Sequence, residues 1–417
     1  MTDTRLKELA EYGFDDVEIS QLRNALFEIA KQTLEHYDEI CEEDLRSLGQ
    51  LTELRHELRK HSPLVETNVM KLYSYIDELL DSIKDHGTPQ FTRQARCAFM
   101  ARSFCRTLVE KGYFTKQEMD DFMLSIPTVA SEFERDFDLY SHGKLSRDDF
   151  NHLYGHLRLG TYDIRSDSYR NIYFDVASAN LTGNNKVKQE AKSLDLERLQ
   201  VALDEAGIPV TPEKFIEFIK KATQNREYFK FEFTKSLSLM LDVIVKLGEV
   251  MAIAREDMSY LEIQDLLSYH SRDSYIQTIE TRRRFYHVNS YLVLPEVIFD
   301  VGDIDVIDID EARPNFITNK VVEAPIVNLD EDHDSDITGK IVVLTKADPG
   351  YDWIFAKDIA GFVTKYGGAA SHMAIRCAEF GIPAAIGCGE KIYQRIHRMQ
   401  IMCLDCENGR ITEKQSQ

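Results

Sequence analysis

The residues best suited to chemistry lie near the end of this 417-residue chain. His372 stands in the string Gly-Gly-Ala-Ala-Ser-His-Met-Ala-Ile, which begins at Gly367 and is followed by Gly381-Ile-Pro. The glycine pair predicts a turn, and Ser371 is a good helix N-cap, so His372 is expected in the first turn of a helix. Unpaired backbone N–H groups at that position favour a phosphoryl group.

The same helix offers a second group for phosphoryl chemistry. Arg376 follows His372 by four residues, so the two side chains share one face of the helix. A neutral imidazole is a nucleophile, and a guanidinium with backbone N–H groups can bind phosphoryl oxygens. His372 is therefore a candidate carrier of a phosphoryl group. On spacing alone the alternative stays open that the strand, the glycine turn and a histidine near the helix start are purely structural. The residues predicted to support the phosphoryl group are Gly367, Gly368, Ser371 and Arg376.

The segment from Gly155 to Arg170 is a second candidate site. It is rich in turn residues and carries charged side chains, as ligand-binding loops do. The candidate acceptor-binding residues are His156, Arg158, Tyr162, Asp163 and Arg165. The two arginines can hold an incoming phosphate, and His156 or Asp163 can deprotonate an acceptor hydroxyl. A solvated surface loop contains the same residue types, so this alternative stays open.

The residues up to about 290 are predicted to be mostly helical. Apolar residues recur at helical spacing, for example between Phe99 and Leu108. Thr115 and Glu118 have the spacing of a capping box, and Ser146 before two aspartates indicates another helix start. The most apolar stretch, 236–254, contains three charged residues and therefore predicts a buried helix rather than a membrane span.

From about residue 315, short strands and helices alternate. Strands are predicted at 340–345, 361–365, 384–386 and 400–404, with helices at 371–380 and from 390 onward. The expected fold class is a multidomain α plus α/β protein, in which a large all-helical N-terminal region precedes a compact β/β/α domain. The predicted divisions are a helical segment and candidate docking arm at 1–90, a helical acceptor-binding domain at 91–290, an acidic connector or hinge at 291–314, the compact domain at 315–412 and a tail at 413–417.

Charge and cysteine content narrow the class of protein. The formal net charge of -21 disfavours sequence-independent binding of nucleic acid or of an anionic membrane. The first 26 residues are charged throughout, without the apolar core of a secretory signal. Seven scattered cysteines suit reduced thiols, so we expect a cytoplasmic protein. Cys403 and Cys406 form a C-x-x-C without a second pair, and no metal site is predicted.

The string around His372, with the Gly-Ile-Pro-Ala that follows, resembles the phosphohistidine mobile domain of phosphoenolpyruvate-utilising enzymes. Segments 155–164, 222–234 and 254–261 are similar to the acceptor-binding helices of rifampicin-phosphotransferase-like and phosphoenolpyruvate-synthase-like kinases. The resemblance covers roughly residues 90–412. Two positions depart from the pattern, because Ala370 and Ala378 stand where family members commonly have threonine and arginine.

The resemblance implies a phosphotransfer function. In such enzymes an ATP-grasp domain phosphorylates the histidine, and the mobile domain carries the phosphoryl group to an acceptor. No ATP-grasp module is recognisable here, so ATP and Mg²⁺ are expected on a separate or missing ATP-grasp partner, and no cofactor is expected on this chain itself. The implied activity is that of an ATP-dependent, dikinase-like phosphotransferase component, inactive alone, that passes phosphate from His372 to a small-molecule acceptor.

Two other functions stay open. The chain can be a non-catalytic regulatory or adaptor subunit that keeps the mobile-domain fold. It can also be a phosphoenolpyruvate or pyruvate phosphotransfer component that needs a separate barrel subunit.

Overall fold

The computed structural model describes residue 6 and residues 9–158, 160–171, 193–289, 314–331, 335–346, 348–369 and 371–414. Almost all of the predicted connector at 291–314, together with Ala370 and the last three residues of the predicted tail, lies outside the described residues. Contacts between residues divide the chain into two compact units. The predicted domain limits at 90 and 290 stay predictions.

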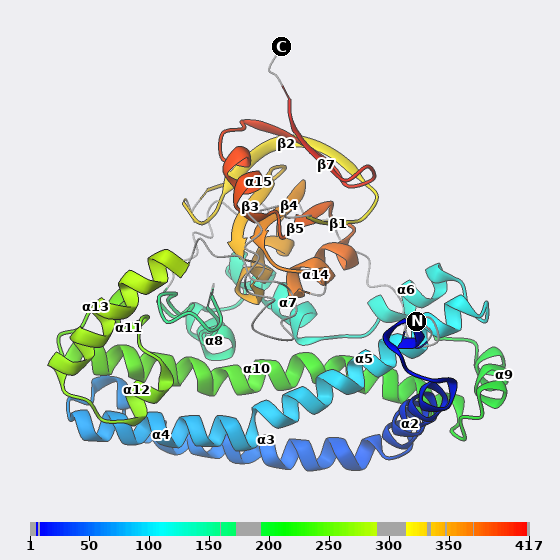
Figure 1. The fold of residues 1–417 in the computed structure, drawn as a ribbon, viewed down its shortest axis with the longest axis horizontal. Helices are drawn as coiled ribbons and strands as arrows, with labels where there is room; N and C mark the ends of the chain where they lie inside the picture. Colours follow the sequence, from blue (N-terminus) through cyan, green and yellow to red (C-terminus); the bar gives the residue numbers. More distant parts are fainter. Residues whose placement is uncertain are drawn as a thin grey trace. The chain divides into compact units, whose positions relative to one another are not determined.

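The first unit consists of Met1–Glu57, Asp81–Val129 and Asn185–Phe233. Its helices are η1 (Leu9–Tyr12), α2 (Asp16–Glu35), most of α3 (Tyr37–Lys60), the end of α4 (Val69–His86), α5 (Thr88–Glu110), α6 (Lys116–Leu124), α9 (Leu196–Ala206) and the first part of α10 (Pro212–Val250) (Figure 1).

The local sequence explains where helices of this unit begin and what they bury. Thr115 caps α6 and forms the predicted capping box with Glu118. Apolar faces of several helices meet in one core, where Phe122, Leu199 and Ile219 are fully buried. Burial of such apolar faces, more than helix propensity, stabilises helices of this length.

The second unit consists of Leu58–Leu80, Ala130–Asn184 and Thr234–Gln417. Its helices before the sheet are the end of α3, η2 (Pro63–Val65), the first part of α4, α7 (Val129–Ser141), α8 (Arg147–Tyr154), the rest of α10, α11 (Arg255–Met258), α12 (Ile263–Leu267) and α13 (Arg272–Asn289). Ser146 caps α8, as its sequence predicts. Phe133 of α7 packs against the rings of Phe150 and Tyr154 of α8, which joins these two helices.

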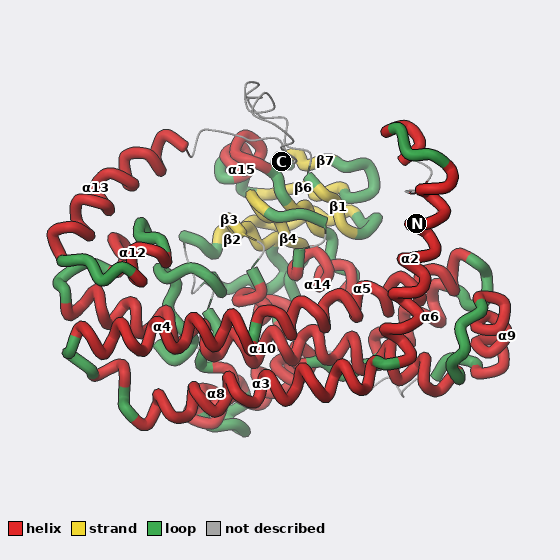
Figure 2. Tube along the Cα trace, turned by 60° about the horizontal axis from the view of Figure 1, so that its bottom comes forward, coloured by secondary structure: helices red, strands yellow, loops and turns green. Residues whose placement is uncertain are grey.

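The strands of the described residues form one seven-stranded sheet in the order β1-β5-β4-β3-β2-β6-β7. They are β1 (Asn315–Ile317), β2 (Val321–Asn328), β3 (Ile341–Lys346), β4 (Gly361–Tyr366), β5 (Ala384–Ile386), β6 (Ile401–Asp405) and β7 (Arg410–Glu413), shown in yellow in Figure 2. Strands β2, β3, β4 and β5 pair in parallel, whereas β1–β5, β2–β6 and β6–β7 are antiparallel.

Strand β2 joins the parallel and antiparallel parts of the sheet. Its residues 326–328 pair in parallel with β3, and its residues 321–325 pair antiparallel with β6. The change of partner falls at Pro325, which has no N–H to donate to a ladder.

Three helical elements accompany the sheet: η5 (Pro349–Ala356), α14 (His372–Phe380) and α15 (Gly389–Ile396). Ile341 and Val343 belong to one apolar cluster with Tyr393 and Ile396 of α15. The intervening Val342 is also fully buried, so β3 is covered on both faces, as is usual for parallel strands. The predicted fold class, a helical N-terminal region followed by a compact α/β domain, is therefore confirmed. None of the described helices combines the length and apolar content needed to span a bilayer.

Candidate functional site

His372 is the first residue of α14, as the sequence predicts. The Ser371 side chain caps the helix by accepting a hydrogen bond from the Ala374 N–H at 3.4 Å. Gly381 ends the helix in the left-handed conformation, with φ of 62°. The His372 side chain is 13% exposed, so it lies in a largely enclosed position at the positive end of the helix.

One of the two glycines before the helix has a backbone that requires glycine. Gly367 has φ of 132°, whereas Gly368 is not in the positive-φ region. Gly387, in the loop after β5, comes so close to this turn that a Cβ on it would lie 2.3 Å from the Gly367 carbonyl oxygen. Gly387 was not identified from the sequence, because the contact joins two loops that are separated along the chain.

The imidazole of His372 is held by a carboxylate. Its Nε2 lies 2.7 and 2.8 Å from the two carboxylate oxygens of Asp352, which belongs to η5. A carboxylate only accepts hydrogen bonds, so this contact places a proton on Nε2. Sequence reasoning missed Asp352. The order of the elements is a signal that could have identified it. η5 follows β3 and the glycine turn follows β4, and segments that follow neighbouring parallel strands lie at the same edge of the sheet.

Arg376 is surrounded by carboxylates. Its guanidinium is ion-paired with Glu134 and with Glu379, the latter at 3.1 Å, and its Nε lies 3.9 Å from an Asp352 oxygen. The Phe380 ring centroid lies 4.5 Å from the guanidinium carbon. Burial opposes the charge of Arg376, but the three carboxylates together raise the pKa of the guanidinium above its ordinary value.

The second candidate segment contacts η5 and the residue that caps it. Thr161 donates from its backbone N–H and, at 2.8 Å, from its hydroxyl to the carboxylate of Asp348. The Tyr169 hydroxyl donates to the carbonyl oxygen of Gly350. The structure therefore brings the segment 160–171 to the loop that carries the carboxylate partner of His372.

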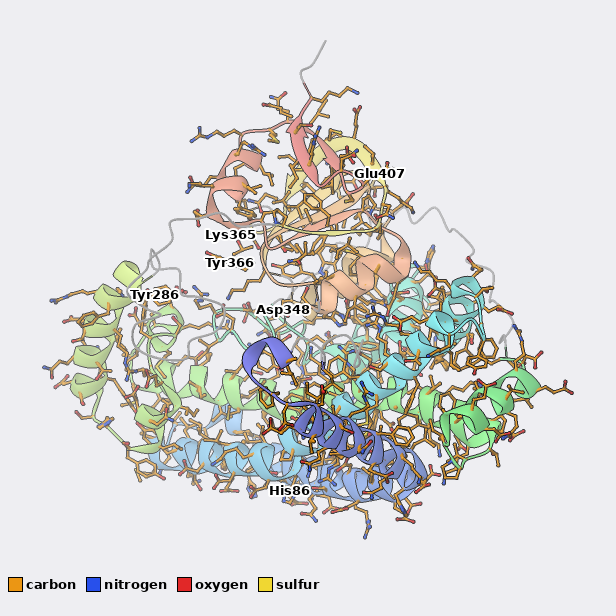
Figure 3. The ribbon with its side chains drawn as sticks, turned by 45° about the vertical axis from the view of Figure 1, so that its right-hand side comes forward. His86, Tyr286, Asp348, Lys365, Tyr366 and Glu407 are labelled. Atoms are coloured by element: carbon orange, nitrogen blue, oxygen red, sulfur yellow. The ribbon has the colours of Figure 1, made fainter. Side chains whose placement is uncertain are left out.

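Part of this segment borders a cavity of about 520 Å³. Three of the predicted acceptor-binding residues line it, namely Tyr162, Asp163 and Arg165, together with Gly160, Ile164, Met240, Leu241, Ile244, Met258, Ser259, Tyr260, Leu261, Ile263, Leu266, Tyr286, Lys346 and Asp348. Figure 3 labels two of these residues, Tyr286 and Asp348. Tyr286 belongs to α13, and Asp348 is the residue that caps η5. The cavity thus has an apolar wall and a few charged groups, and its volume is typical of small-molecule sites.

Three of the charged groups that line the cavity, Asp163, Arg165 and Lys346, are paired with one another. Arg165 donates to both oxygens of Asp163 at 2.9 and 2.6 Å, and Lys346 Nζ lies 3.6 Å from Asp163. The hydrogen bond from Arg165 is the main reason that the pKa of the Asp163 carboxyl falls to about 2.

Two of the predicted acceptor-binding residues, His156 and Arg158, are buried and are not among the residues lining this cavity. Arg158 donates to the hydroxyl and the carbonyl oxygen of Ser238, both at 3.0 Å, to the Ser166 carbonyl oxygen at 2.6 Å and to Asp242. Burial is the main reason that the pKa of its guanidinium is lowered, and Asp242 opposes the effect. The position of Arg158 is that of an anchor between the segment and α10.

Comparison with known proteins finds one matching family model and two similar proteins. Residues 337–409 match the family model described as the mobile domain of PEP-utilising enzymes. The chain is 28% identical over 222 residues to the rifampicin phosphotransferase of Bacillus subtilis, which covers 48% of this chain and 24% of that protein. It is 26% identical over 212 residues to the rifampicin phosphotransferase of Bacillus cereus, which covers 46% of this chain and 24% of that protein.

The chain thus spans about a quarter of the length of the curated relatives that it matches. The resemblance expected from the string around His372 is confirmed, for the mobile domain by the family model and for about half of the chain by the relatives.

Proposed function

We propose that this chain is the histidine-carrying and acceptor-binding component of a phosphotransferase. The observation that carries the proposal is the position of His372, at the N-terminus of α14 and inside the segment that matches the mobile domain. A ring nitrogen of His372 attacks the donor phosphorus, an N–P bond forms, and the P–O bond to the leaving group breaks. The expected donor is ATP, bound with Mg²⁺ on an ATP-grasp protein or domain.

In the second transfer, the acceptor hydroxyl oxygen attacks phosphorus, the N–P bond breaks, and the hydroxyl proton balances the charge on the released imidazole. We assign acceptor binding to the cavity beside 160–165, because its apolar wall and charged residues suit a small molecule with an apolar body and a hydroxyl group. With a pKa of about 2, Asp163 is a weak base, so its role is to orient the hydroxyl. Positioning of this kind supplies most of the catalysis in phosphoryl transfer.

The first experiment tests the carrier. The full chain is incubated with β-³²P-labelled ATP and a purified ATP-grasp protein, as wild type, as His372→Gln and as His397→Gln. His397 is a matched control, because it lies in the same domain and its Nδ1 is 3.5 Å from Glu331, away from α14. We expect acid-labile label in the wild type and in His397→Gln, and none in His372→Gln. Equal label in all three proteins refutes His372 as the carrier.

The second experiment separates an enzyme component from an adaptor subunit. One observation favours the adaptor, namely that Arg376 is bonded to carboxylates rather than open to a phosphoryl group. The labelled protein is chased with rifampicin, because the relatives carry that name, and then with a panel of other hydroxyl compounds and with pyruvate. Transfer of the label to a compound, weakened in Tyr162→Ala, supports the enzyme. Label that no compound removes supports the adaptor.

A further inference from the structure

The contacts of His372 hold its imidazole in an arrangement that does not favour phosphoryl transfer. We use the name C-terminal domain for the sheet with η5, α14 and α15, residues 315–413. We propose that Asp352 masks His372 while this C-terminal domain is docked on the segments around Glu134 and 160–171, and that loss of this docking unmasks the histidine. This inference rests on the proposed function, because it concerns the same histidine. All of the residues involved belong to the second compact unit.

The first step concerns the nucleophile. The Asp352 carboxylate lies within 2.8 Å of Nε2 through both of its oxygens, so the Nε2 lone pair is engaged in an N–H bond. The carboxylate also places a negative charge where an anionic phosphoryl donor would approach. In this arrangement Nε2 can neither attack phosphorus nor attract the donor. Unmasking requires Asp352 to leave, so that the ring proton can reside on Nδ1.

The second step concerns the cation. A phosphoryl group on His372 would be stabilised by Arg376, one helical turn away. The guanidinium is instead engaged by Glu134, Glu379 and, at 3.9 Å, by Asp352. Carboxylates therefore occupy both groups that a phosphoryl transfer needs from α14.

The third step connects the mask to docking. Glu134 lies on α7, outside the C-terminal domain, and binds Arg376, which in turn lies beside Asp352. The loop that carries Asp352 is also fixed from outside, because Thr161 binds Asp348 and Tyr169 binds Gly350. When these contacts are lost together, η5 and Arg376 lose the bonds that keep the carboxylate on His372.

The test uses phosphoramidate, a small donor that needs neither the ATP-grasp partner nor the acceptor. A ring nitrogen attacks its phosphorus, an N–P bond to the ring forms, the original P–N bond breaks, and ammonia leaves with the proton. Labelling of His372 in the full chain is followed by mass spectrometry, and ³¹P NMR identifies which ring nitrogen carries the phosphoryl group.

The central variant is Asp352→Asn, which keeps the shape of the side chain but removes its charge. We expect labelling at Nε2 to rise about tenfold or more, because a unit negative charge is removed next to the reacting nitrogen. A merely structural role for Asp352 would alter the melting temperature without moving the label toward Nε2. Labelling at Nε2 that is unchanged or slower in a folded Asp352→Asn protein overturns the mask.

A matched pair of variants tests the connection to docking. Glu134→Gln and Glu379→Gln each remove one carboxylate from Arg376, but Glu379 lies on α14 itself, at an i, i+3 position. We expect faster labelling in Glu134→Gln and in Tyr169→Phe, and a smaller effect in Glu379→Gln. Equal rates in Glu134→Gln and Glu379→Gln refute the docking connection.

The two proposals fail in distinguishable ways. If ATP with the ATP-grasp protein never labels His372, the proposed function fails, while a faster phosphoramidate reaction of Asp352→Asn still supports the mask. If ATP labels His372 but Asp352→Asn does not change the phosphoramidate reaction, the mask fails and the proposed function stands.

Discussion

Replacing Arg158 by methionine is expected to destabilise the second compact unit strongly. The Arg158 side chain is 1% exposed, and each of its three nitrogens donates a hydrogen bond, to Ser166, to Ser238 or to Asp242. Methionine fills much of the space but leaves the Asp242 carboxylate without its cation. Removing one partner of a buried ion pair typically costs about 3–5 kcal/mol.

We expect a loss of unfolding free energy near the lower end of this range, because the Asp242 side chain is 20% exposed and its carboxylate can be partly hydrated. A loss of about 3 kcal/mol lowers the melting temperature of a unit of more than 200 residues by about 6–10 °C. Hydrogen exchange should also accelerate in residues 160–171, since Arg158 anchors the Ser166 carbonyl to α10.

Differential scanning calorimetry of the full chain measures the effect, with Arg165→Met as the matched control. Arg165 also pairs with an aspartate in the same segment, but its side chain is 44% exposed, and exposed pairs contribute about 1 kcal/mol or less. The anchoring role is refuted if Arg158→Met melts within about 2 °C of the wild type, which corresponds to about 1 kcal/mol or less. It is also refuted if the melting temperature of Arg165→Met falls as far as that of Arg158→Met.

Two further outcomes are expected. In Gly387→Ala the new methyl group meets the Gly367 carbonyl oxygen. We therefore expect slower phosphoramidate labelling of His372 and a lower melting temperature. An unchanged labelling rate and an unchanged melting temperature would show that the turn before α14 does not affect the site. Burial raises the pKa of the Cys406 thiol to about 11 and that of the Cys388 thiol to about 12. Iodoacetamide at pH 8 should therefore modify the half-buried Cys403 first, which peptide mass spectrometry can measure. Early alkylation of Cys388 would contradict this burial.

Local signals predicted the elements around His372. The Ser371 cap, the start of α14 at His372 and the glycine that ends the helix depend on residues within a few positions of one another. The same is true of the capping box of Thr115 and Glu118. Such features follow from backbone geometry and short-range hydrogen bonds, which the sequence displays directly.

The partners of the site were not predictable in the same way. Asp352 and Glu134 reach His372 and Arg376 through the tertiary arrangement, and no local spacing connects them. For Arg158, in contrast, the local sequence favoured a role that its buried position does not support. Its place in a turn-rich, charged segment favoured a ligand-binding role, but only the burial of its guanidinium against α10 distinguishes an anchor from a phosphate ligand.

The pairing of the sheet bears on how the C-terminal domain is made. Asn315 pairs with Ile386, and Val321 pairs with Asp405, so β1 and β2 find their antiparallel neighbours only after most of the domain has been synthesised. Long-range pairing requires large loops to close first, which slows folding. Until β6 is available, residues 321–325 form an open strand edge that can recruit other chains. By pairing with this edge, the β6–β7 hairpin completes the sheet, and we expect it also to limit aggregation of the newly made domain.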